Sequence, residues 1–288
     1  MYQNNIQDSP ENEYTTQISY SQRAILKDKA KGALAGKYTR AALSVLIIGV
    51  VTLAMQLAVE FIAGFILGIV FIARTLSNTS LTPDQLAVLL QQGTIPESYS
   101  GLLFVIDYGL IQFSSLFTTI FQAGSALFCL NLACGREARI SDIFYGYRYA
   151  FRKSFSISAV YVLISQLYLI PANVLNYYVR QEFDPERIVL WSAILVAGAI
   201  LFIPLSLCVS QSFYLLLDFP DQSAGELIKL SVRIMEGQKG RLFILRLSFL
   251  PLMVLSFFTI GVGNLFLTPY MNVTYALFFL KLMHSRAE

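Results

Sequence analysis

The side chains of this sequence that could do chemistry are acidic and amide groups within apolar stretches. Glu60 is the only charge in the apolar run 41–72, and Asp107 stands near the start of the next run. A carboxylate inside a membrane span is costly and is usually kept for a function. Together with Gln56, these residues form a candidate intramembrane polar site for a proton or a cation.

The alternative is that these carboxylates lie in water, where the spans leave the membrane. A helix rises about 1.5 Å per residue, so about nineteen residues from Ala41 to Glu60 cover about 28 Å, close to the thickness of a hydrocarbon core. We favour this interfacial position for Glu60. It applies more strongly to Asp107, which lies nearer the end of its run.

Seven further polar groups lie in or beside apolar runs. They either line a polar cavity or form hydrogen bonds between helices, and the second role is the more common one. The seven are Gln122, Asn131, Gln166, Asn173, Gln211, Asn264 and Asn272.

Signatures of catalysis and of metal binding are missing from the sequence. It has no HExxH motif, no Walker loop and no paired intramembrane aspartates. The sole histidine is His284, and Cys129, Cys134 and Cys208 form no CxxC pair. We therefore predict that the protein is not an enzyme and has no cofactor and no metal site. The net charge of +3 is too small to indicate a nucleic-acid partner.

Basic residues recur on three amphipathic segments, 21–36, 141–154 and 223–237. Ser223 and Glu226 have the spacing of a capping box, which predicts the start of the third helix. Basic side chains near a membrane surface attract anionic headgroups, although an ordinary positive-inside bias would also place them there. The candidate anionic-lipid contacts are Lys27, Lys31, Arg148, Arg152, Lys229 and Arg233.

The elements that carry these residues are predicted to be helices crossing a membrane. Hydrophobic residues make up 56% of the 288 residues and charged residues 14%, and spans in lipid must be helical. We predict an all-α, polytopic protein with a polar, disordered tail at 1–20 and one transmembrane domain at 21–288, with a short surface helix at 82–93. Its six spans are expected at about 41–72, 102–132, 155–178, 188–217, 243–263 and 265–283.

The distribution of positive charge predicts the orientation of these spans. If both termini are cytoplasmic, only Arg74, Arg180 and Arg187 of the 21 Lys and Arg residues fall on the opposite side. The positive-inside rule therefore places both termini and the three amphipathic segments in the cytoplasm. Aligning Gly36, Gly146 and Gly237 also suggests a three-fold internal repeat of an amphipathic helix plus a hairpin.

Several blocks of the sequence resemble a known family. SVRIMEGQKGRLFILRLSF followed by TPYMNVTYALFF resembles the C-terminal signature of the bacterial membrane family called domain of unknown function 975, and RAILKDKAKGALAGKY and ACGREARISDIFYGYRYAF resemble its other two blocks. The resemblance covers nearly everything after residue 20. The chain departs from it in span five, where Pro251 and Leu252 stand in place of tryptophans. The resemblance implies a multi-pass protein of the bacterial cell membrane, typical of Gram-positive bacteria, with no established reaction to carry over.

Two functions remain open from the sequence. The first is a non-enzymatic scaffold, assembly or envelope factor that contacts membrane lipids or another membrane protein. The second is a small-solute transporter or channel with a polar site near Glu60. The sequence indicates no oligomeric state.

Overall fold

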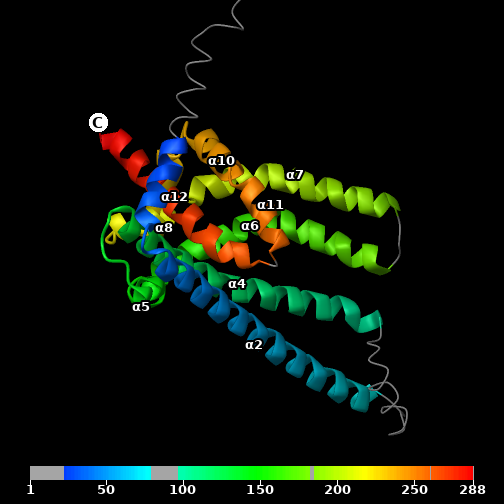
Figure 1. The fold of residues 1–288 in the computed structure, drawn as a ribbon. Coiled ribbons are helices and arrows are strands. Elements are labelled where there is room, and N and C mark those ends of the chain that lie inside the picture. The colour runs from blue at the N-terminus through cyan, green and yellow to red at the C-terminus, as the bar shows by residue number, and fades with distance from the viewer. Residues whose placement is uncertain (1–22, 79–96, 182–184, 260, 288) are drawn as a thin grey trace, which may run out of the picture.

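The protein is described by a computed structural model that covers residues 23–78, 97–181, 185–259 and 261–287. Within these ranges every regular element is helical (Figure 1). The predicted tail 1–20 and the predicted surface helix 82–93 lie outside them. In chain order the elements are a helix over 23–34, α2 (Tyr38–Asn78), α4 (Glu97–Ala133), the 3-10 turn η1 (Ile140–Phe144), α5 (Tyr145–Arg148), α6 (Phe151–Gln181), α7 (Pro185–Val209), α8 (Ser212–Asp218), α9 (Ala224–Ile234), α10 (Lys239–Leu247), α11 (Leu250–Phe258) and α12 (Val262–Ala287).

The structure supports a membrane-embedded helical protein. Within the described residues, five stretches are long and apolar enough to cross a membrane: Tyr38–Ile66, Tyr108–Ala133, Ile188–Asp218, Lys239–Phe258 and Val262–His284. The remaining predicted span, 155–178, falls in α6, a helix of 31 residues that is not among the five. The described residues therefore contain five candidate spans, and the sixth span stays a prediction.

Two of the predicted spans are broken rather than continuous helices. The span predicted at 243–263 consists of α10 and α11, which are separated at Ser248 and Phe249. Pro251 explains the break, because proline lacks an amide hydrogen and its ring clashes with the carbonyl four residues earlier. The span predicted at 188–217 consists of α7 and α8, separated at Ser210 and Gln211. Pro204 lies within α7 and not at this break.

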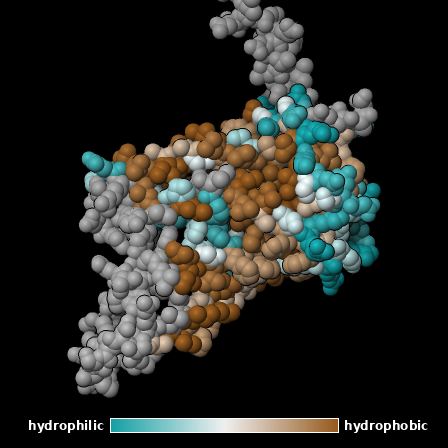
Figure 2. All heavy atoms as spheres, turned by 180° about the vertical axis from the view of Figure 1, so that it is seen from behind, coloured by the Kyte–Doolittle hydropathy of each residue, from teal (hydrophilic) through white to brown (hydrophobic). Residues whose placement is uncertain are grey.

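The elements share a core at one end of the molecule. The N-terminal helix 23–34, the end of α4, the α8–α9 pair and the second half of α12 contribute its buried side chains. Figure 1 shows the helix 23–34 and the C-terminal end of α12 at this same end, from which α2, α4, α6 and α7 extend. Figure 2 shows hydrophilic residues covering this end and an apolar belt beside it. The two ends of the described chain therefore lie on one side of the apolar belt.

Helices α4 and α12 are central in the bundle, whereas α2 and α7 are peripheral. Half of the most apolar window of Tyr108–Ala133 is buried, compared with 6% for Tyr38–Ile66 and none for Ile188–Asp218. Large apolar side chains such as Leu53, Phe61 and Ile200 are exposed on the peripheral helices. In a membrane these faces would contact lipid, because the hydrocarbon core replaces the protein interior as their apolar surroundings.

A close backbone crossing fixes the segment between α4 and α6. Gly124 in α4 lies against η1, and a Cβ atom at this position would be 1.9 Å from the carbonyl oxygen of Ile143. Gly146 in α5 similarly approaches the carbonyl oxygen of Ile120, and Tyr147 donates a hydrogen bond to the carbonyl oxygen of Phe117 (2.5 Å). The amphipathic segment predicted at 141–154 is thus divided among η1, α5 and the start of α6.

The backbone agrees with only two of the three glycines on which the repeat was aligned. Gly36 and Gly237 both end a helix with positive φ, 71° and 74°. Gly146 lies inside α5 and is buried instead. The three-fold repeat therefore stays a prediction. Gly261 has φ 80° and lies between α11 and α12, which pack against each other.

Candidate functional site

Of the predicted intramembrane polar site, the structure describes the side chains of Glu60 and Gln56. Glu60 is exposed on α2, and among the described residues no hydrogen bond or ion pair links it to the half-buried Gln56 one turn earlier. Asp107 lies in α4, but its side chain is outside the part that the structure describes. The proton or cation site at these residues stays a prediction.

Four of the seven amides that lie in or beside apolar runs form structural hydrogen bonds. Gln166 in α6 donates to the Oε1 atom of Gln112 in α4 (2.7 Å) and accepts from the hydroxyl of Tyr108. Asn131 at the end of α4 donates to the carboxylate of Asp142 in η1 (3.1 Å). The remaining two contacts are Asn173 with the carbonyl oxygen of Leu169 (2.8 Å) and Ser256 with Asn264 (2.8 Å). Three of these groups join different elements, whereas the bond of Asn173 lies within α6.

The other three amides lie around one interior cavity of about 190 Å³. We call it the Arg246 cavity, because this residue is its only charged wall. Its lining comes from α4, α6, the α7–α8 break, α8, α10 and α12. The lining residues are Thr119, Gln122, Tyr161, Ser210, Gln211, Phe213, Tyr214, Leu242, Arg246, Asn272 and Tyr275.

Two polar atoms of the Arg246 cavity are buried without a hydrogen-bond partner. Gln211 is 2% exposed, and its Nε2 atom donates to the hydroxyl of Ser210 (2.9 Å) while its Oε1 atom has no hydrogen-bond partner. The Nε atom of Arg246 is likewise buried and unpaired. The guanidinium carbon lies 5.5 Å from the ring centre of Tyr275, a cation–π distance.

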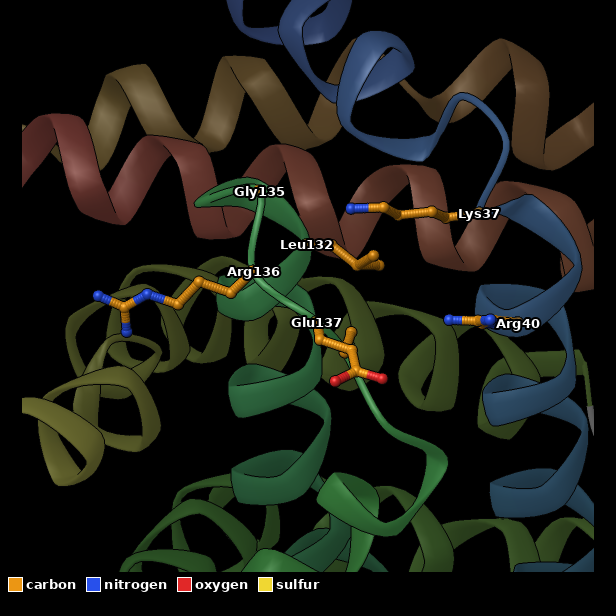
Figure 3. A pocket seen from close by; sticks show the side chains of 7 residues that line it. Lys37, Arg40, Leu132, Gly135, Arg136 and Glu137 are labelled. Carbon is orange, nitrogen blue, oxygen red and sulfur yellow. The ribbon is translucent and has the colours of Figure 1, made fainter.

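A second candidate site is an interfacial cleft of about 270 Å³, shown in Figure 3. We call the cleft lined by Lys37, Arg40, Leu132 and 135–138 the basic cleft. Figure 3 shows Lys37 and Arg40 reaching from the start of α2 toward the segment after α4. The Glu137 carboxylate faces the α2 side, and Arg136 points away.

The location of the basic cleft follows from the ends of two candidate spans. Lys37 directly precedes the span Tyr38–Ile66, and Gly135 lies just after the span Tyr108–Ala133. Gly135 has φ 71°, which lets the chain turn sharply at the end of α4. The cleft thus lies where apolar helix gives way to the hydrophilic end.

The charge of the basic cleft is positive. Its one carboxylate, Glu137, accepts a hydrogen bond from Arg139 (3.2 Å), and both side chains are about two-thirds exposed. Lys37 and Arg40 have no ion-pair partner among the described side chains. Two cations and the apolar floor of Leu132 are suited to a phosphate group attached to an acyl chain.

Five of the six predicted anionic-lipid contacts are exposed in the structure: Lys31, Arg148, Arg152, Lys229 and Arg233. Lys27 is different, because its ammonium donates to the carbonyl oxygen of Ser248 (3.0 Å) and lies 4.2 Å from the ring centre of Phe249. Partial burial, and then the neighbouring Arg23 and Lys31, lower the pKa of Lys27. Lys27 therefore ties the N-terminal helix to the α10–α11 break.

Arg246, Lys37 and Arg40 are not among the site residues predicted from the sequence. Arg246 was counted only as one of the charges of the cytoplasmic side, although it lies seven residues into the candidate span Lys239–Phe258. The sequence signal that could have identified Arg246 as a site residue is the position of an arginine within an apolar run. Among the described residues no group of His, Cys, Asp and Glu could hold a metal ion.

Comparison with known proteins identifies the family of the chain. Residues 21–286 match the family described as Protein of unknown function (DUF975), and the chain belongs to this family. The predicted family resemblance is thereby confirmed. No curated protein and no solved structure matches the chain significantly.

Proposed function

We propose that this member of the DUF975 family is a non-enzymatic protein of the bacterial cell membrane that binds anionic phospholipid headgroups at its basic end. It crosses the membrane six times, with both termini in the cytoplasm. Through this contact it acts as a scaffold, assembly or envelope factor. The proposal is supported most directly by the basic cleft, which lies between the ends of two candidate spans and holds two unpaired cations at the start of one of them.

The level of the cleft favours a lipid ligand over a soluble one. Lipid headgroups occupy the membrane surface, where one apolar stretch begins at Tyr38 and another ends at Ala133. A phosphate there meets Lys37 and Arg40 while its acyl chains follow the apolar face of α2. Each cation near an anionic surface contributes about 1 kcal/mol, so the pair contributes about 2 kcal/mol.

Exposed cations on other elements extend the same surface. Lys31 lies on the helix 23–34, Arg148 on α5 and Arg233 on α9, and all three are exposed. Because these segments share the core at one end of the molecule, their charges act on the same side of the apolar belt. The basic end is thus broader than the cleft, which is its most enclosed part.

The alternative function, transport of a small solute through a polar site near Glu60, has less support. It requires a polar path from Glu60 into the bundle, yet Glu60 is exposed on the peripheral helix α2 and does not line the Arg246 cavity. The polar lining of that cavity is the observation that keeps transport as a second candidate.

The experiment is retention of lipid by the purified full-length chain. Protein is placed in nanodiscs of phosphatidylcholine mixed with phosphatidylglycerol, and the retained anionic lipid is counted by native mass spectrometry. The variant Lys37→Gln with Arg40→Gln is expected to weaken retention of phosphatidylglycerol by about thirtyfold, the equivalent of about 2 kcal/mol.

The matched control removes the same charge outside the cleft. Lys29→Gln with Arg241→Gln changes two exposed residues, on the helix 23–34 and at the start of α10, that do not line the cleft. This control is expected to stay within about threefold of the parent protein, since screened charges farther from the headgroup contribute less. Equal losses in the two variants would reduce the effect to general charge attraction, and unchanged retention in both would refute the proposal.

A further inference from the structure

We propose that the Arg246 cavity binds a small organic phosphate with a hydroxyl group next to it, of the glycerol-phosphate type. The cavity shares no residue with the basic cleft, so this inference does not rest on lipid binding at the cleft. The phosphate belongs either to a free solute or to a phospholipid headgroup, and the two sources are separated below by experiment.

The charge of Arg246 requires an anion. The residue lies seven positions after Lys239, which places it about 10 Å along the candidate span Lys239–Phe258. Among the described side chains the structure gives it no carboxylate partner. A cation this far into an apolar zone is costly, and such residues pair with another charge or mark a ligand path. The guanidinium supplies a planar fork of donors that suits phosphate or carboxylate oxygens.

The other polar residues that line the cavity favour a phosphate over a carboxylate. The hydroxyls of Thr119 and Ser210 already donate to the carbonyl oxygens of Ser115 and Leu207. The other polar groups that line the same space as Arg246 are the hydroxyl of Tyr161 and the amides of Gln122 and Asn272. These groups offer more donors than the two oxygens of a carboxylate can accept. A phosphate has more acceptor oxygens, which can be shared among several walls.

The side chain of Gln211 is the reason for proposing a hydroxyl group on the ligand. Its Oε1 atom is a buried acceptor without a partner, and an unmade hydrogen bond of this kind is costly. Its Nε2 atom is already used by Ser210. A hydroxyl on the carbon next to the phosphate ester would donate to this free acceptor while the phosphate reaches Arg246.

The size and position of the cavity limit the ligand further. A volume of about 190 Å³ is below the 300–1,000 Å³ of drug-sized pockets, so only a small group fits. Gln122 lines the cavity and is itself exposed, so the cavity opens to the surface beside α4. Through this opening a headgroup or a solute can enter without unfolding the core.

The helices hold the cationic wall in a fixed orientation. Tyr275 contacts both the guanidinium of Arg246 and the ring of Phe249, whose centre is 6.1 Å from that of Tyr275. Tyr214 is stacked on Phe279 at 5.1 Å. Aromatic contacts of this kind order the side chains before a ligand arrives, which reduces the entropy lost on binding.

The experiment has two arms that use the full-length chain. In the first arm, the protein in phosphatidylcholine nanodiscs is titrated with sn-glycerol 3-phosphate and the heat of binding is measured. In the second arm, phosphatidylglycerol is added to the nanodiscs and retained lipid is counted by native mass spectrometry. Saturable binding in the first arm identifies a free solute or a bare headgroup, and retention in the second arm alone identifies a lipid.

Three variants test the assignment in whichever arm shows binding. Arg246→Gln is expected to weaken binding by at least about tenfold, because a charge-assisted hydrogen bond is lost. Arg241→Gln, which changes an exposed residue of the same helix, is expected to stay within about twofold, since Arg241 does not line the cavity. Gln122→Trp at the exposed rim should block entry while leaving Arg246 intact, which preserves the test if Arg246→Gln fails to fold.

Two results would overturn the inference. One is the absence of saturable binding in both arms for a protein that is monodisperse and folded. The other is binding that is the same in the parent protein, Arg246→Gln and Gln122→Trp. Loss in Lys37→Gln with Arg40→Gln but not in these variants would place the lipid at the basic cleft and leave the cavity without a ligand.

Discussion

The crossing of η1 over α4 makes Gly124 the position at which the smallest substitution should do the most damage. In Gly124→Ala the new Cβ atom would lie 1.9 Å from the carbonyl oxygen of Ile143, 2.3 Å from its carbonyl carbon and 2.7 Å from its Cα atom. Ordinary contact begins at 3.4 Å, so the backbone of η1 must move by the difference between 3.4 and 1.9 Å, about 1.5 Å. Ile143 is fully buried, so its side chain would be displaced as well.

The expected cost lies at the upper end of overpacking effects. Such substitutions typically destabilise by about 1–3 kcal/mol, and a clash with backbone leaves little room for a cheap rotamer change. We expect a loss of about 3 kcal/mol, which lowers the Tm by roughly 6–12 °C in a domain of this size. The readout is thermal unfolding in detergent, followed by the fluorescence of the single tryptophan, Trp191.

The matched control is Gly109→Ala in the same helix. A Cβ atom there meets nothing within 4 Å, so the substitution is expected to leave the Tm unchanged or to raise it slightly through better helix propensity. If Gly124→Ala and Gly109→Ala melt at the same temperature, η1 does not cross α4 at this distance and the reasoning fails.

Three more predictions follow from other contacts. Hydrogen bonds from Ser223 lower the pKa of Glu226. The contribution of Glu226 to the cap of α9 is therefore fully present above the ordinary glutamate pKa of 4.5 and is lost as the pH falls through the lowered pKa. Amide exchange at the start of α9 should show this loss, and Glu226→Gln should abolish the pH dependence of the exchange. Lys27→Met keeps the apolar stem but removes the bond to Ser248, and thermal unfolding should show a loss of about 1–2 kcal/mol. Glu60→Gln removes an exposed charge and should leave both the Tm and lipid retention unchanged.

Each of these three has an outcome that contradicts it. Exchange at the start of α9 that stays constant on acidification would mean that the Glu226 cap is absent. A Lys27→Met protein as stable as the parent would show that the N-terminal helix is not held at the α10–α11 break. A loss of solute uptake in Glu60→Gln, with the fold intact, would return Glu60 to the candidate site and favour the transporter.

Features that depend on neighbouring residues were predictable from the sequence. The capping box needs only Ser223 and Glu226, which lie within one turn, and the structure confirms both of its hydrogen bonds. Membrane embedding follows from long apolar runs because a span is a property of one continuous segment. Family membership likewise depends on the order of blocks along the chain.

Tertiary structure alone decided how these segments meet. Gln122, Arg246 and Asn272 are up to 150 positions apart and line one cavity because α4, α10 and α12 pack together, and no local pattern encodes that distance. The packing of the helices also decided which basic residues of one helix are partly buried and which are exposed. Lys27 became a structural cation while Lys31 stayed exposed, because burial depends on which helix covers a face. The sequence thus determined the helices and their membrane setting, and packing determined which of their polar groups face one another.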